Sequence, residues 1–217
     1  MIEAVVFDMD GVLIDSEQVW DGVRVDQARE RGGRWHPGAT RDMMGMSSPE
    51  WSRYMRDVIG LRETPEEINR EVVERMLALY ADGPPWLPGA VDAVRRLAAA
   101  YPLGLASSSN RELIDVVLEA GGIGDLFRAT VSSEEVARGK PAADVYLEAV
   151  RRLGFAPAAC AAIEDSRNGI RSAKAAGLAC IAVPNEHFAP GEDALADADV
   201  VVGSVTDLTA GLVASLS

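Results

Sequence analysis

The stretch that decides the fold is AVVFDMDGV, residues Ala4 to Val12. Its first four residues are an uninterrupted apolar run, which predicts a buried strand. Asp8 and Asp10 follow at the strand end, and Gly11 supplies the turn. Two carboxylates in this position can hold a divalent cation and still leave one oxygen free to react. Because the DxDG pattern is short, its meaning depends on what the rest of the chain places beside it.

Length, charge and hydropathy restrict the class of protein. A chain of 217 residues can form one large domain or one domain with an insertion. A net charge of −13 offers no basic field, so neither nucleic acid nor a membrane is expected as a partner. No apolar run approaches the roughly 18 residues of a membrane span. No basic and apolar signal segment precedes Asp8, so we expect a soluble, cytoplasmic protein.

Cysteines and histidines are scarce. Cys160 and Cys180 lie in apolar surroundings and predict buried, reduced thiols rather than a zinc site or a disulfide. The two histidines, His36 and His187, give little support to a histidine metal site or a Ser-His-Asp triad. The chemistry is therefore expected to depend on carboxylates.

Two of the 21 basic residues are lysines, Lys140 and Lys174. Lysine carries a compact charge on a flexible stem, whereas arginine presents a planar fork. We expect the role of Lys140 to require the compact, flexible charge of lysine, and we expect Lys174 to lie on a solvated helix face.

Strand and helix patterns alternate from residue 86 onward. Strands are expected at residues 102–106, 129–131, 160–163, 180–183 and 199–202, and helices at 89–100, 111–120, 141–153, 168–176 and 206–213. Pro141 suits the first turn of its helix. This alternation predicts an α/β fold, a doubly wound parallel sheet with helices on both faces.

Residues 16 to 84 interrupt the alternation with helical patterns only, at 16–31, 48–58 and 64–81. Thr64, followed by Pro65 and two glutamates, is a good start for the last of them. We therefore expect a catalytic core of residues 1–15 and 85–217 and an all-helical cap of residues 16–84. The cap is expected over the carboxyl edge of the sheet, where open α/β sheets bind ligands.

Polar side chains follow four of the predicted strands. They are Asp8 and Asp10 after the first strand, Ser107, Ser108, Ser109 and Asn110 after the second, Lys140, and Glu164, Asp165 and Ser166. Each group alone is explained by a helix cap, a turn or a solvated charge. Parallel strands end at the same sheet edge, so we expect these side chains to converge.

The converging groups suit phosphate chemistry. Asp8 and Asp165 would bind Mg²⁺, a hard cation that prefers oxygen ligands, and the free oxygen of Asp8 would attack phosphorus. Lys140 and Ser107 would hold the phosphate oxygens, with help from the amides and hydroxyls of the serine run. Asp10 would protonate the leaving oxygen and then deprotonate water.

In its motifs the chain resembles the haloacid dehalogenase-like hydrolase superfamily. The motifs are Asp8-Met9-Asp10-Gly11-Val12-Leu13, Leu105-Ala106-Ser107-Ser108-Ser109, Gly139-Lys140-Pro141 and Ile163-Glu164-Asp165-Ser166, in this order. The resemblance implies a Rossmann-like core, a helical cap, Mg²⁺, an aspartyl-phosphate on Asp8 and proton transfer by Asp10. It also implies that the carbonyl of Asp10 binds the metal and that Glu164 supports the metal site.

Within the superfamily the chain is similar to the β-phosphoglucomutase and sugar-phosphatase group. Asp15-Ser16-Glu17, the loop at Gly45 and the run from Lys140 to Tyr146 carry this similarity. The mutase has a histidine where Trp20 stands and an arginine where Ser48 stands, so the mutase remains an alternative only. Trp20-Asp21 instead resembles phosphatases of hexose, hexitol and 2-deoxyglucose 6-phosphates.

Other reactions of carboxylate enzymes are less compatible with the chain. A dehalogenase has no need of a second carboxylate such as Asp10, and a phosphonatase requires a cap lysine that residues 16–84 lack. A receiver module phosphorylated on aspartate has no helical insertion of this size.

We therefore predict a phosphatase of small phosphorylated sugars or sugar alcohols, a monomer or small homo-oligomer. Its cap is expected to bring Glu17, Trp20, Arg24, Met44 and Gly45 to the substrate, although Trp20 and Met44 could equally pack between cap and core.

Overall fold

A computed structural model describes residues 1–185 and 189–216, so His187 lies outside the described residues. Within them, the strands are β1 (Ala4–Phe7), β2 (Leu103–Ser107), β3 (Phe127–Ser132), β4 (Cys160–Glu164), β5 (Ala179–Ala182) and β6 (Val200–Val201). They form one parallel sheet in the order β3-β2-β1-β4-β5-β6. The strand order reverses between β1 and β4, and the carboxyl end of such a switch point is where α/β sheets bind ligands.

Ten α-helices lie in the described part of the chain. Those of the insertion are α1 (Glu17–Glu30), α2 (Ala39–Met43), α3 (Ser48–Tyr54) and α4 (Pro65–Tyr80); the others are α5 (Ala90–Ala98), α6 (Arg111–Ala120), α7 (Asp144–Leu153), α8 (Arg167–Ala175), α9 (Glu192–Leu195) and α10 (Ala210–Ala214). A π-helical turn, Met55–Ile59, extends α3. Short 3-10 turns cover Gly124–Leu126, Ser133–Glu135, Pro157–Ala159 and Val205–Asp207.

Alternate residues of β1 face opposite layers of the core. Val5 and Phe7 belong to a cluster that includes α5, α6 and α10, whereas Ala4 and Val6 belong to a second cluster with α7 and α8. All four side chains have no exposed surface, as a strand covered by helices on both faces requires. The predicted doubly wound parallel sheet is confirmed.

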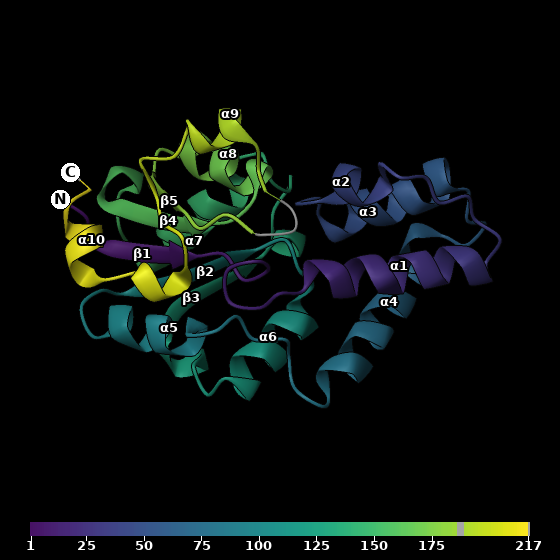
Figure 1. The fold of residues 1–217 in the computed structure, drawn as a ribbon, viewed down its shortest axis with the longest axis horizontal. Helices are drawn as coiled ribbons and strands as arrows, with labels where there is room; N and C mark the ends of the chain where they lie inside the picture. The colour runs from purple at the N-terminus through teal and green to yellow at the C-terminus, as the bar shows by residue number, and fades with distance from the viewer. Residues whose placement is uncertain (186–188, 217) are drawn as a thin grey trace.

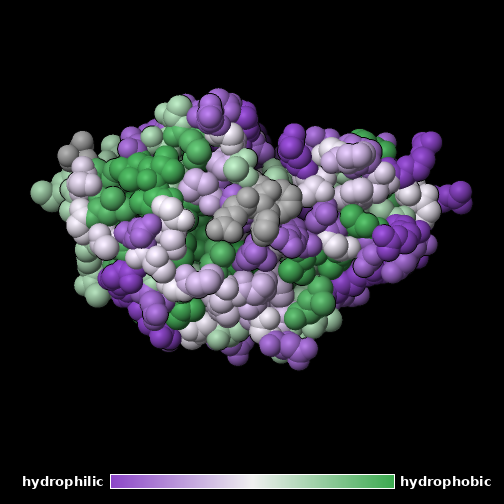
Figure 2. Space-filling view, viewed as in Figure 1, coloured by the Kyte–Doolittle hydropathy of each residue, from purple (hydrophilic) through white to green (hydrophobic). Residues whose placement is uncertain are grey.

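Helices α1 to α4 form the inserted helical cap, beyond the end of β1 (Figure 1). Trp51, Ile68 and Met76 are fully buried among these helices and join the core cluster on the α5 and α6 side of the sheet. Hydrophilic residues gather over the outer end of the cap (Figure 2). The cap thus has an apolar interior that is continuous with the core and a solvated outer surface.

Two predicted helix boundaries are wrong. The helix expected from Pro141 begins at Asp144, because the backbone at residues 139–142 forms a turn in which the N–H of Ala142 donates to the carbonyl of Gly139 at 3.0 Å. The Lys140–Pro141 peptide bond is cis. The helix expected at 206–213 is a 3-10 turn followed by α10, whose start is capped by Thr209. The short helices α2 and α9 were not predicted.

Cys160 and Cys180 are buried free thiols, as predicted. Within the described residues, no helix is both long and apolar enough to cross a membrane.

Candidate active site

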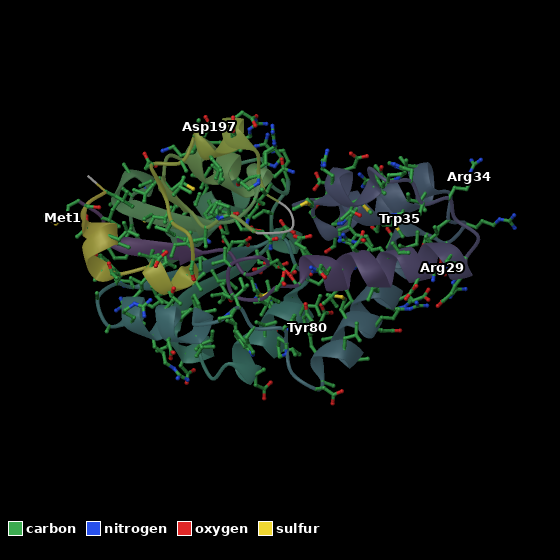
Figure 3. The ribbon with its side chains drawn as sticks, viewed as in Figure 1. Met1, Arg29, Arg34, Trp35, Tyr80 and Asp197 are labelled. Atoms are coloured by element: carbon green, nitrogen blue, oxygen red, sulfur yellow. The ribbon has the colours of Figure 1, made fainter. Side chains whose placement is uncertain are left out.

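Four loops at the carboxyl edge of the sheet place their polar side chains together. Asp8 follows β1, Ser107 ends β2, Lys140 lies between β3 and α7, and Glu164 and Asp165 follow one another at the end of β4. All five are at most 5% exposed. In Figure 3, oxygen atoms gather where β1 ends and α1 begins. The convergence of these side chains at one sheet edge is therefore a feature of the structure.

Lys140 is the cation at the centre of this cluster. Its Nζ lies 2.9 Å from Asp8 Oδ1 and 2.6 Å from Glu164 Oε1. Burial alone would lower the pKa of Lys140, but the carboxylates of Asp8 and Glu164 raise it above its usual range. The buried ammonium group therefore remains charged and binds two carboxylates at once.

The Glu164 carboxylate is surrounded by donors from its own loop and from α7. Oε1 accepts hydrogen bonds from Lys140 Nζ and, at 2.7 Å, from the hydroxyl of Tyr146. Oε2 accepts hydrogen bonds from the backbone N–H groups of Asp165 and Ser166 and from the Ser166 hydroxyl. Because both oxygens already accept hydrogen bonds, Glu164 is arranged to hold the loop and Lys140 in place.

Asp8, Glu164 and Asp165 form an acidic group in which one carboxylate oxygen from each residue lies within 4.8 Å of the other two. Burial and the charge of Glu164 raise the pKa values of Asp8 and Asp165. Asp165 Oδ2 is buried and accepts no hydrogen bond from any residue in the described ranges. Gly11 lies directly against this oxygen, where a Cβ atom would be 1.9 Å away. Hard oxygen donors with an unsatisfied buried oxygen fit a divalent cation such as Mg²⁺.

Asp10 has a different environment from Asp8. Its Oδ1 accepts hydrogen bonds from the Ser16 hydroxyl at 2.5 Å and from the indole N–H of Trp20 at 3.2 Å. Its Oδ2 accepts hydrogen bonds from the hydroxyls of Ser107 at 3.2 Å and Ser109 at 2.7 Å. All four donors are neutral. Two of them belong to the insertion, so the orientation of Asp10 depends on both core and cap.

The remaining residues of the serine run join the core to the cap. The Ser108 hydroxyl donates to the carbonyl of Gly45 at 3.1 Å. The Asn110 side chain accepts a hydrogen bond from Ser48 at 2.9 Å and donates to Glu134 at 2.7 Å. The Ser107 hydroxyl accepts the N–H of Ser109 in addition to donating to Asp10. Here Ser107 and Asn110, expected to contact phosphate, make hydrogen bonds within the protein.

A pocket that is partly open to solvent lies between core and cap. The lining residues that the sequence analysis named are Asp8, Asp10, Glu17, Trp20, Arg24, Met44, Gly45, Ser108, Ser109, Lys140, Asp165 and Ser166. Met43, Met46 and Trp51 line the pocket too. Trp20 packs edge-on against Trp51, with ring centroids 6.0 Å apart, so it both lines the pocket and packs within the cap. Burial and the charge of Asp10 raise the pKa of Glu17 to about 7.

Three contributors to the site were not predicted as site residues. Tyr146 supports Glu164, Ser16 holds Asp10, and Asn168 of α8 donates to the carbonyl of Met44 at 2.8 Å. Tyr146 and Ser16 lie inside motifs that the sequence already singled out. Neither motif indicates which carboxylate its hydroxyl contacts, because the partners come from different elements.

Known proteins are similar to this chain in sequence and in fold. Residues 2–177 match the family described as haloacid dehalogenase-like hydrolase. Hexitol phosphatase B of Escherichia coli is 33% identical, over 96% of this chain and 95% of that protein. Fructose-1-phosphate phosphatase YqaB of Escherichia coli is 30% identical, over 82% and 94%. The crystal structure of CbbY from Rhodobacter sphaeroides in complex with phosphate is 30% identical and superimposes with a TM-score of 0.84 over 96% of each chain. The chain belongs to the haloacid dehalogenase-like hydrolase family.

Proposed function

We propose that the protein is an Mg²⁺-dependent phosphatase that hydrolyses a small phosphorylated sugar or sugar alcohol through an aspartyl-phosphate. The observation that carries the proposal is the contrast between the two aspartates of one pocket. Asp8 lies beside an ammonium group and an acidic cluster, whereas Asp10 is held by four neutral donors. The similarity to hexitol phosphatase B and to a fructose-1-phosphate phosphatase supports the substrate class.

The reaction runs in two displacements. A carboxylate oxygen of Asp8 attacks phosphorus, and the bond to the ester oxygen breaks as Asp10 donates a proton to it. Asp10 then removes a proton from a water molecule, whose oxygen attacks phosphorus and breaks the bond to Asp8. The products are the alcohol and inorganic phosphate, and both aspartates return to their starting states.

The surrounding groups balance charge and hold these aspartates. Asp8, Asp165 and the backbone carbonyl of Asp10 would hold Mg²⁺, which when bound offsets the repulsion between the carboxylates and the phosphate. Lys140 neutralises charge on Asp8 and reaches the same pocket. Ser107, Ser108, Ser109 and Asn110 supply donors near the phosphate, and Glu164 orients Lys140.

We also propose a core of residues 1–15 and 85–217 and a cap of residues 16–84. A cytoplasmic location, a monomeric or small homo-oligomeric state, and the absence of nucleic-acid and membrane partners stay predictions.

A panel of phosphorylated metabolites tests the proposed function. We expect Mg²⁺-dependent phosphate release from hexose, hexitol or ketose monophosphates, and loss of that release when EDTA removes the cation. β-Glucose 1-phosphate with a bisphosphate activator distinguishes a mutase, because a mutase would isomerise this substrate without net release of phosphate. Trp20 disfavours the mutase, since an indole N–H donates a hydrogen bond but does not relay a proton. The proposal would be contradicted if the enzyme, with Mg²⁺ present, hydrolysed none of the compounds in the panel.

Asp10→Asn is expected to lower kcat by about 10²- to 10⁴-fold, because the side chain then neither donates nor accepts the proton. Asparagine keeps the shape of Asp10, and the hydroxyls of Ser107 and Ser109 can rotate to accept from its amide. Rapid quenching is expected to trap phosphoenzyme, which mass spectrometry detects. The matched control is Asp26→Asn on the exposed side of α1, for which we expect wild-type kinetics. Unchanged kinetics of Asp10→Asn would remove this residue from proton transfer.

A further inference from the structure

Arg24, in the middle of α1, has an unusual environment. Its guanidinium carbon lies 4.7 Å from the ring centroid of Trp20 and 4.7 Å from that of Trp51. The residue is 7% exposed and lines the pocket between core and cap. Two indole rings thus hold the guanidinium group in place by cation–π contact.

The guanidinium group has no hydrogen-bond partner among the residues that the structure describes. Its Nε atom is buried without an acceptor, and no hydrogen bond or ion pair joins Arg24 to any other residue in the described ranges. Burial lowers the pKa of Arg24 to about 10, against the opposing charges of Glu17 and Asp21. Arg24 therefore remains charged at neutral pH. A buried charged donor without an acceptor costs stability, so this arrangement is explained best by an acceptor that arrives with a ligand.

Glu17 complements Arg24 on the same helix face. It lies seven residues before Arg24, two turns away, with Trp20 between them. Glu17 is half-buried, lines the same pocket and accepts no hydrogen bond from a described residue. Glu17 and Arg24 do not form an ion pair with each other, because no nitrogen of Arg24 lies within 4.0 Å of a carboxylate oxygen of Glu17. The pocket therefore offers, side by side, an acceptor, an aromatic surface and a donor.

We infer that Arg24 and Glu17 determine specificity by binding hydroxyl groups on the non-reacting end of the substrate. A hydroxyl group can accept a hydrogen bond from Arg24 and donate one to Glu17. The Trp20 ring offers an apolar surface to the C–H groups between neighbouring hydroxyls. This inference rests on the proposed function and adds to it that the recognised end is an uncharged polyol chain.

Charge favours a neutral polyol over a second phosphate at this end of the pocket. Four carboxylates line the pocket, from Asp8, Asp10, Glu17 and Asp165, against the two cations Lys140 and Arg24. The proposed Mg²⁺ would offset Asp8 and Asp165 but leave Glu17 and Asp10. Of the cations, Lys140 already lies beside Asp8 and Glu164. A second phosphate dianion near Arg24 would therefore be repelled by Glu17 and Asp10.

The test compares substrates with and without hydroxyl groups. Wild-type enzyme, Arg24→Met and Glu17→Gln are assayed with Mg²⁺ on sorbitol 6-phosphate, on p-nitrophenyl phosphate and on fructose 1,6-bisphosphate. Arg24→Met keeps an unbranched apolar side chain and removes the guanidinium group. We expect kcat/KM for sorbitol 6-phosphate to fall about 10- to 100-fold more than for p-nitrophenyl phosphate in Arg24→Met, as loss of a charged hydrogen bond implies. Glu17→Gln is expected to shift the same ratio in the same direction.

Controls separate specificity from structural damage. Arg29→Met changes an exposed arginine of the same helix and is expected to leave the ratio unchanged. If Arg24→Met fails to fold, Arg24→Lys is assayed instead, because lysine keeps the positive charge but lacks the planar set of guanidinium donors. We expect a smaller fall in the ratio of the kcat/KM values for the two substrates.

Two outcomes would overturn the inference. One is an equal loss on sorbitol 6-phosphate and p-nitrophenyl phosphate in the Arg24 variants. The other is a wild-type preference for the bisphosphate that Arg24→Met abolishes, because Arg24 would then bind a second phosphate. Failure of the proposed function has a different signature, since wild-type enzyme would then release phosphate from none of the three compounds.

Discussion

Asp8→Asn is expected to lower kcat for phosphate release by at least about 10⁴-fold while leaving the fold intact, as loss of an attacking group does in other hydrolases. An asparagine oxygen is a poor nucleophile, and the amide offers one oxygen rather than two. The substitution also removes one of three crowded carboxylates, and the asparagine still fits beside the ammonium group of Lys140. Phosphate-release kinetics measure the loss, and circular dichroism with thermal unfolding measures the fold.

The prediction for Asp8→Asn has a matched control and a result that would contradict it. The matched control is Asp125→Asn, in a 3-10 turn away from the pocket, which is expected to retain wild-type activity. If Asp8→Asn retained turnover with unchanged folding, Asp8 would not be the nucleophile. If a phosphoenzyme still formed in that variant, the covalent intermediate would lie on another residue.

Lys140→Met is expected to destabilise the protein by about 3–5 kcal/mol, because it removes the ammonium group that Asp8 and Glu164 share in the interior. Lys140 is 3% exposed, so water does not screen the carboxylates that remain. Activity is expected to fall below detection as well. The free energy of unfolding is measured by urea denaturation in EDTA, so that no divalent cation replaces the lost charge.

The chain supplies its own control for this substitution. Lys174 is its only other lysine, and its Nζ lies 2.6 Å from Asp199 at the surface. Lys174→Met is therefore expected to change the free energy of unfolding by less than about 1 kcal/mol, since exposed ion pairs contribute little. Equal destabilisation by the two substitutions would contradict a special electrostatic role for Lys140.

Much of the fold was predictable from local pattern. The apolar run at Ala4–Phe7 is β1, and the regular spacing of helices and strands after residue 86 indicated the parallel sheet. The start of α7 was not predictable from Pro141, because proline suits either a first helical turn or the turn that precedes a helix. The position of α10 depends on the cap formed by Thr209, which ordinary helix patterning did not indicate.

The residues of the candidate site could be predicted from the sequence, but many of the hydrogen bonds between them could not. Asp8, Lys140 and Asp165 could be grouped from sequence because each follows a strand of one sheet. The four donors around Asp10, and the hydroxyl of Tyr146 on Glu164, could not be assigned in this way. Those contacts depend on where the insertion and α7 pack.

The family, the alternation of strands and helices along the chain, and the carboxylates and lysine at one sheet edge could all be predicted from the residues. This was possible because strand periodicity is local and parallel strands all end on the same side. The packing of the cap on the core determines which donor meets which carboxylate, and it places the guanidinium group of Arg24 against both Trp20 of α1 and Trp51 of α3. Such contacts join residues far apart in the chain, so they follow from the packing of the cap on the core and not from any local pattern.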